Sequence, residues 1–168
     1  MHTEMKVTSL TIDPNTNMPV VILKDLQDRN IVSIWIGLIE ASAIATELEQ
    51  IELARPMTHD LLCSVVQALG GHLDGVEVCE LRDTTFFAHL LLNRDGQQLQ
   101  IDARPSDAIA LALRMGSPIF VSEQVLEKSR QLSSQFDGLN LSDPGIEAAR
   151  WAEFLETLPI REFGKYKM

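Results

Sequence analysis

The feature that most constrains the fold of this 168-residue chain is an internal repeat. Sliding the chain on itself by 65 residues places residues 36–48 on residues 101–113, and five of the thirteen aligned pairs are identical. Both halves also show the same expected order of strand, turn, strand, alanine-rich helix and a second helix that begins at a hydroxyl residue. This pattern predicts a duplicated strand–strand–helix unit. The alternative is two unrelated hairpins that share common helix-forming residues.

Periodicity gives the expected elements. Alternation of apolar and polar residues predicts strands over 6–12, 18–26, 31–37, 72–81, 85–92, 97–103 and 118–121. Helical spacing predicts helices over 38–53, from Thr58 to Gly70, over 105–115 and after Ser122. Thr58 and Ser122 are the expected N-caps, because hydroxyl oxygens accept bonds from free N–H groups at a helix start. Together these elements predict an α+β fold, with mixed or antiparallel sheets and packed helices.

The helix expected over 105–115 is apolar on nearly every side. Ala108, Ala110 and Ala112 alternate with larger aliphatic residues, so no polar face is left for solvent. This composition predicts a buried helix whose alanines allow neighbouring elements to approach closely.

The chain divides into a main domain and an extension. Residues 1–130 contain both halves of the repeat, whereas residues 131–168 begin with a polar linker. An amphipathic helix is expected after Asp143, with an apolar stripe formed by Trp151, Phe154, Leu155 and Leu158. The stripe is expected to dock on the main body or on a second subunit.

Charge limits the possible partners. The net charge is −10 and the pI is about 4.8, so the whole chain repels polyanions at long range. A nucleic-acid partner would need a local basic patch or bridging cations. Cys63 and Cys79 lack zinc-site spacing and are expected to be reduced core residues. Without a signal peptide or a long apolar run, we expect a cytoplasmic protein with no membrane partner.

The two strand-to-helix corners of the repeat differ in chemistry. Gly37, Ile39 and Ser42 in the first half correspond to Asp102, Arg104 and Asp107 in the second. The first corner shows that such a turn can form without charged residues. The polar residues of the second corner are therefore a candidate site. In a purely structural alternative, Asp107 complements the helix dipole and Asp102 pairs with Arg104. The residues alone do not decide between a functional site and a structural role.

Longer motifs resemble a known family. The segments "IWIG", "RPMTHDLL", "RPSDAIALA" and "GSPIFVS" occur in the order found in the bifunctional nuclease family, formerly a domain of unknown function. The resemblance covers residues 5–130. It implies a mixed α+β fold with an internal duplication, a homo-oligomer, and metal-dependent cleavage of both DNA and RNA.

The resemblance also implies which motif residues form the site. The expected catalytic residues are His59, Asp60, Asp102 and Asp107. The expected substrate-binding residues are Arg55, Arg104 and Ser106. Glu40, Asp102 and Asp107 are the expected ligands of Mg²⁺ or Mn²⁺, which would activate water and neutralise phosphate charge. The alternative function is a non-catalytic oligomeric module that binds a small anion or a protein partner.

Overall fold

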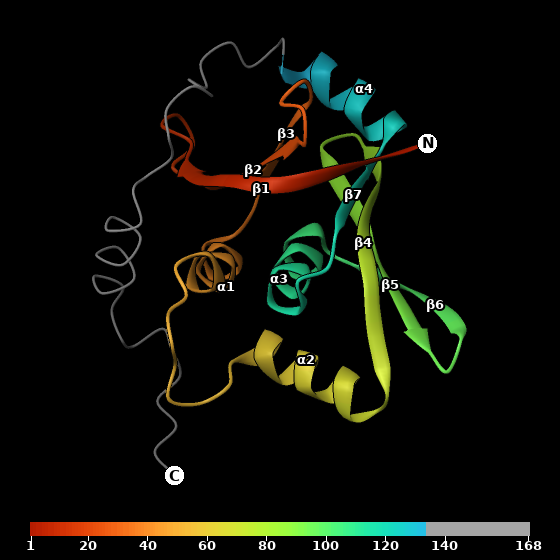
Figure 1. The fold of residues 1–168 in the computed structure, drawn as a ribbon. Helices are drawn as coiled ribbons and strands as arrows, with labels where there is room; N and C mark the ends of the chain where they lie inside the picture. Colours follow the sequence, from red (N-terminus) through yellow and green to blue (C-terminus); the bar gives the residue numbers. More distant parts are fainter. Residues whose placement is uncertain (134–168) are drawn as a thin grey trace.

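The computed structural model describes residues 1–133, and the amphipathic helix expected after Asp143 lies outside them. Within the described residues, a single sheet is accompanied by four helices (Figure 1). The strands are β1 His2–Ile12, β2 Pro19–Asp25, β3 Ile31–Trp35, β4 Gly71–Arg82, β5 Thr85–Arg94, β6 Gln97–Ala103 and β7 Ile119–Ser122. The helices are α1 Leu38–Leu48, α2 Thr58–Ala68, α3 Pro105–Met115 and α4 Glu123–Ser133. None of the described helices is long and apolar enough to cross a membrane.

The sheet consists of two meanders joined through β7. Its strand order is β3-β2-β1-β7-β4-β5-β6, and all neighbours are antiparallel except β4 and β7, which are parallel. In Figure 1 the first meander runs across the top and the second down the right, with α1 and α3 in the angle between them. The expected α+β class with a mixed sheet and packed helices is confirmed.

The order of elements is the same in the two halves. Each half has three strands followed by two helices, with β7 inserted before the last helix. The α2 and α4 helices begin 65 residues apart (123 − 58), and α1 and α3 begin 67 residues apart (105 − 38). The order of strands and helices from which the duplication was predicted is therefore present in the structure.

The two expected hydroxyl caps have different outcomes. Ser122 does cap α4, because its Oγ accepts a bond from the Val125 N–H at 3.3 Å. Thr58 is not the N-cap of α2 but its first helical residue, and Met57 is the N-cap. The Asp60 carboxylate accepts the Met57 N–H at 2.7 Å, so it satisfies the backbone donor of the N-cap residue from the first turn of the helix.

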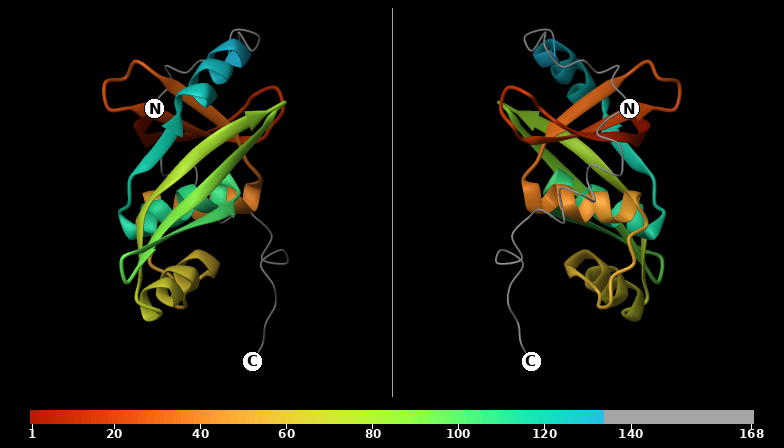
Figure 2. Two further views of the ribbon diagram at one scale, coloured as in Figure 1. Left: turned by 90° about the vertical axis from the view of Figure 1, so that its right-hand side faces the viewer. Right: turned by 90° about the vertical axis from the view of Figure 1, so that its left-hand side faces the viewer.

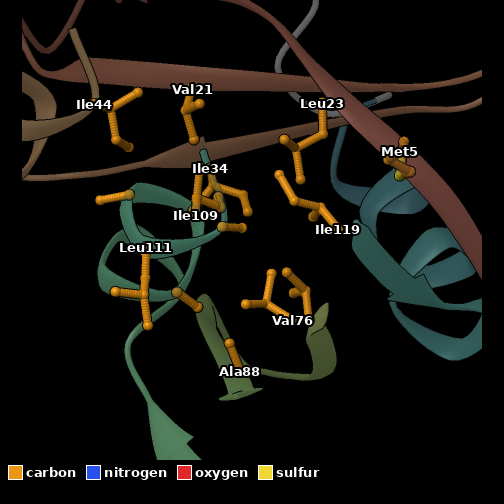
Figure 3. Close-up of a cluster of buried hydrophobic side chains, with 14 of the residues drawn as sticks. Met5, Val21, Leu23, Ile34, Ile44, Val76, Ala88, Ile109, Leu111 and Ile119 are labelled. Carbon is orange, nitrogen blue, oxygen red and sulfur yellow. The ribbon is translucent and has the colours of Figure 1, made fainter. Parts of the chain in front are cut away.

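The α3 helix forms the centre of the core. Residues 108–112 are fully buried, and the helix contacts α1, α2, β4 and β5. Figure 3 shows Ile109 and Leu111 among side chains of both meanders, including Ile34 and Ala88. The prediction of a buried alanine-rich helix is confirmed. Because this helix is clamped between the two halves, its ends are held in fixed positions.

Candidate functional site

The two strand-to-helix corners meet in space. A pocket of about 330 Å³ lies between the β3–α1 corner, which supplies Gly37 and Glu40, and the start of α3, which supplies Arg104 and Ser106. The turn between β4 and β5 closes a further side at Thr84. The fold brings these segments together because α1 and α3 pack against each other in the angle between the two meanders (Figure 2). Residues that are 64 positions apart (104 − 40) therefore share one site.

Arg104 connects the two corners electrostatically. Its Nη1 donates to Glu40 Oε1 at 2.7 Å, and its Nε donates to Asp107 Oδ2 at 2.7 Å. A further bond runs from Nη2 to Asp107 Oδ1 at 3.2 Å. These bonds raise the pKa of Arg104 above its ordinary value, with Asp107 contributing more than Glu40. The side chain is nevertheless 64% exposed, so it remains accessible from the pocket.

His59 lies behind this arginine. Its Nε2 is 3.1 Å from Asp107 Oδ1, although the residues are 48 positions apart. Burial acts to raise the pKa of Asp107, but the bonds from Arg104 and His59 outweigh it and the pKa is lowered. Asp107 is therefore an anion held between a guanidinium and an imidazole. His59 and Asp107, both expected as catalytic residues, therefore lie in contact. Neither lines the pocket, but Asp107 binds Arg104, which does.

Asp60 takes part in a different interaction, at the other end of α3. Arg114 donates from Nε to Asp60 Oδ1 at 2.6 Å and from Nη1 to the Ala43 carbonyl at 3.0 Å. The bond from Arg114 is the main cause that lowers the pKa of Asp60, against the opposite effect of burial. Arg114 is only 5% exposed and ties α3 to both α1 and α2. The sequence analysis did not single out Arg114, although an arginine in an otherwise apolar helix indicates a buried polar interaction.

Asp102 lies on the opposite face of the sheet. Ala103 pairs with Ala88, which is buried on the side of the sheet that packs against α3. Asp102 pairs with His89, and successive side chains of a strand point to opposite faces. The structure therefore separates Asp102 from the pocket. Arg55 is exposed in the loop between α1 and α2, whereas Ser106 is buried and lines the pocket.

The predicted metal ligands do not form a metal site. Within residues 1–133, no three His, Cys, Asp or Glu side chains are grouped so that they could hold an ion. Glu40 and Asp107 both bind the Arg104 guanidinium, which takes the place that a cation would need. The ligand set of Glu40, Asp102 and Asp107 does not fit a divalent metal in this arrangement.

Trp35 lies at the end of β3, next to the pocket, and its ring is held on the other side of the sheet. Ile34 and Ile36 point into the core, so the side chain of Trp35 between them points to the opposite face. The Trp35 Nε1–H donates to Asp13 Oδ2 at 3.0 Å, and buried Asp13 also accepts bonds from Asn15 N–H and the Thr16 hydroxyl. The indole ring is therefore anchored. Nothing in the local sequence pattern connects Asp13 with Trp35.

Comparison with known proteins identifies the family. Residues 21–134 match the family described as the bifunctional nuclease domain. Two relatives from Mycobacterium tuberculosis, Uncharacterized protein Rv1829 (strain ATCC 25618 / H37Rv) and Uncharacterized protein MT1877 (strain CDC 1551 / Oshkosh), are each 35% identical over 95% of this chain and 97% of their own length. Bifunctional nuclease 1 of Arabidopsis thaliana is 27% identical over 62% of this chain and 34% of its own length. The matched region contains both corners and all four described helices, and the chain belongs to the bifunctional nuclease domain family.

Proposed function

We propose that this protein is a nuclease that cleaves phosphodiester bonds of DNA and RNA at the pocket between the two corners. The observation that carries the proposal is the position of Arg104. Three of its five N–H groups bind Glu40 and Asp107. Within residues 1–133 the other two N–H groups donate to no side chain or carbonyl, so they can bind a ligand. These remaining donors, one on each Nη atom, can bind the oxygens of a phosphate. The family and the name of the Arabidopsis relative support the same activity.

The proposed roles follow the geometry of the pocket. Arg104 binds the scissile phosphate and stabilises the charge that develops on its oxygens. Glu40, the carboxylate that lines the pocket, accepts a proton from the attacking water. Ser106 donates a hydrogen bond to the phosphate, and His59 and Asp107 position Arg104 from behind. The resemblance predicts Mg²⁺ or Mn²⁺, but because the described carboxylates do not form its site, no step here depends on a metal.

The charge of the pocket predicts how binding responds to salt. One arginine faces two carboxylates, and the whole chain carries a charge of −10. Long-range attraction of a polyanion is therefore absent, and binding must rely on short-range donors. A site that neutralises one phosphate gives a salt slope near −0.9 on duplex DNA or −0.7 on a single strand, by order of magnitude. A much steeper slope would point to a basic surface elsewhere.

The test compares two exposed arginines. Arg104→Met removes the phosphate donor, whereas Arg94→Met changes an arginine of similar exposure at the β5–β6 hairpin. We expect Arg104→Met to lower cleavage of DNA and RNA oligonucleotides by about 100-fold or more, comparable with the loss of an electrostatic donor in other enzymes. Arg94→Met should retain activity. Assays with Mg²⁺, Mn²⁺ or EDTA test the metal requirement separately, and undiminished cleavage by repurified Arg104→Met would refute the proposed site.

The alternative function is a non-catalytic module. It is favoured by the ion pairs at both ends of α3, which lock the two halves whether or not a substrate binds. In that case no oligonucleotide is cleaved by the wild-type protein under any of the three metal conditions. Retained binding of phosphate without cleavage would support this alternative directly.

An exposed apolar stripe on α2 supports the proposal of a homo-oligomer. Met57, Leu61, Val65 and Leu69 are spaced by four residues and are all exposed, and Leu62 beside them is exposed as well. Rows at a spacing of four form the ridges by which helices interlock, and a straight row is complementary to itself about a two-fold axis. We expect α2 of a second copy to cover it. Leu61→Glu should lower the mass measured by light scattering, whereas Leu26→Glu, at a comparably exposed leucine after β2, should not.

A further inference from the structure

Gly37, at the start of α1, differs from the other glycines of residues 1–133 in what a side chain would meet there. Three of the other five have positive φ angles, which favour glycine in any sequence. A Cβ on either of the remaining two would lie 3.1 Å from a backbone carbonyl oxygen. At Gly37 the three nearest atoms all belong to one side-chain carboxylate, that of Glu40. The absence of a side chain at residue 37 is therefore connected with the pocket that both residues line.

The Glu40 carboxylate occupies the space that a side chain of residue 37 would need. A Cβ on Gly37 would lie 3.1 Å from Glu40 Cδ and closer still to Oε2. The carboxylate thus lies against the backbone where α1 begins, and from there its Oε1 accepts the bond from Arg104 Nη1 at 2.7 Å. A side chain on residue 37 must push this carboxylate aside, and Arg104 would then lose its acceptor in the first corner.

The backbone at residue 37 does not itself require glycine. Gly37 has a φ of −73° and a ψ of 164°, values that every residue type can adopt. The N-cap of α3 is Arg104, with a φ of −69° and a ψ of 145°. The corresponding position of the second half therefore carries a long side chain on nearly the same backbone. Since backbone strain does not exclude a side chain at residue 37, the Glu40 carboxylate gives the reason for the glycine.

The two corners use their N-cap and third helical residues differently. In α3 the N-cap Arg104 binds the carboxylate of Asp107, three residues further on. In α1 the N-cap has no side chain, so the carboxylate of Glu40, also three residues further on, lies over it and binds Arg104 of the other corner. The glycine thus allows the carboxylates of both corners to meet at one guanidinium.

We propose that Gly37 is a positioning residue of the pocket, because its missing side chain leaves the space from which the Glu40 carboxylate binds Arg104 and faces the substrate. The geometric part of this inference depends only on the contacts of Gly37, Glu40 and Arg104. Its effect on catalysis rests on the proposed nuclease function, in which Glu40 accepts a proton from the attacking water. A general base must lie within hydrogen-bond reach of the proton it accepts, so a displaced carboxylate should slow the chemical step.

The first experiment tests the geometry without any turnover. Crystal structures of Gly37→Ala and Gly37→Ser are compared with that of the wild-type protein. Both variants should fold, because the added Cβ meets the far end of a flexible side chain and not the backbone. We expect Glu40 Oε1 to lie beyond hydrogen-bonding distance of Arg104 Nη1 in both variants, while the backbone of α1 keeps its position. A bond that is retained in either variant would overturn the inference.

The second experiment measures kcat and KM for cleavage of DNA and RNA oligonucleotides. We expect Gly37→Ala and Gly37→Ser each to lower kcat by about tenfold or more at a nearly unchanged KM, since a general base contributes at least this much. Neither should lower kcat further in a Glu40→Gln background. Serine is a favoured N-cap and alanine a poor one, so wild-type activity of Gly37→Ser would assign a capping role and overturn the inference. A raised KM that persists in the Glu40→Gln background would show that the added group blocks the substrate, and would overturn it as well.

Together the two experiments separate this inference from the proposed function. If the wild-type protein cleaves nothing but both variants lose the bond between Glu40 and Arg104, the nuclease proposal is refuted and the positioning of Glu40 by Gly37 is upheld. If cleavage is lost in Arg104→Met but unchanged in Gly37→Ala and Gly37→Ser, the nuclease proposal stands and the role of Gly37 is refuted.

Discussion

The two ends of α3 carry an arginine each, and the two arginines have different roles. Arg114, at the C-terminal end, is 5% exposed and binds Asp60 and the Ala43 carbonyl. Arg104, at the N-terminal end, is 64% exposed and binds Glu40 and Asp107 beside a pocket. Each uses three of its five N–H groups in bonds to described residues, but only Arg104 is exposed, so that a ligand can reach its remaining donors. Burial, and not the number of ion pairs, distinguishes a structural arginine from a functional one here.

The largest expected effect tests this difference directly. Arg114→Met leaves the Asp60 carboxylate and the Ala43 carbonyl without their donor, so we expect a loss of about 3 kcal/mol in the free energy of unfolding. Arg104→Met removes an exposed pair and should cost about 1 kcal/mol or less. Urea unfolding of both variants gives the two values. Similar losses at the two ends would contradict the assignment of separate roles.

The middle of α3 should respond to added volume. Ala110→Leu places extra methyl groups where the helix has no exposed surface, so overpacking should cost about 1–3 kcal/mol. Ala68→Leu, at an exposed alanine of α2, should be nearly neutral because leucine is a good helix former. Thermal or urea unfolding of both proteins decides the matter. A neutral Ala110→Leu would mean that α3 is less tightly enclosed than its burial indicates.

Acid should weaken both ends of α3. The pKa values of Asp60 and Asp107 are lowered in the folded protein, so each carboxylate stabilises the fold fully above its unfolded pKa near 3.9. This contribution is lost as the pH falls through the lower folded pKa. Asp60→Asn and Asp107→Asn should therefore be less stable than wild type near pH 6 and approach it near pH 2. A difference that stays constant over this range would exclude ionisation as its cause.

The smallest effect is expected at His59. Its bond to Asp107 is one of several on that carboxylate, so His59→Gln should change the free energy of unfolding by about 1 kcal/mol or less. If His59 only positions Arg104, cleavage should fall while its dependence on pH keeps the same shape. Loss of one limb of that pH profile would instead assign proton transfer to the imidazole.

Much of the fold was predictable because periodicity is a local signal. The strands, the buried alanine helix and the Ser122 cap all follow from neighbouring residues, and the repeat indicated that the two corners are related. Thr58 was misplaced by one residue, because the competing Asp60 carboxylate caps the helix from inside its first turn. Helix ends depend on such local competition and are hard to place by pattern alone.

The candidate site was only partly predictable. The sequence singled out Glu40, Arg104 and His59, but their meeting depends on how α1, α2 and α3 pack. The position of Asp102 could have been deduced, since it alternates with Ile101 and Ala103 in a strand.

The pairing of β1 with β7 has a consequence for how the chain folds. His2 lies opposite Ser122, so this contact closes a loop of 120 residues (122 − 2). Contacts of such long range are slow to form, because the chain entropy is lost before any contact compensates for it. During synthesis β1 must wait with one edge unpaired until β7 has left the ribosome. A pulse-labelling experiment should therefore find the amides of the β1–β7 ladder protected last, after both meanders have formed.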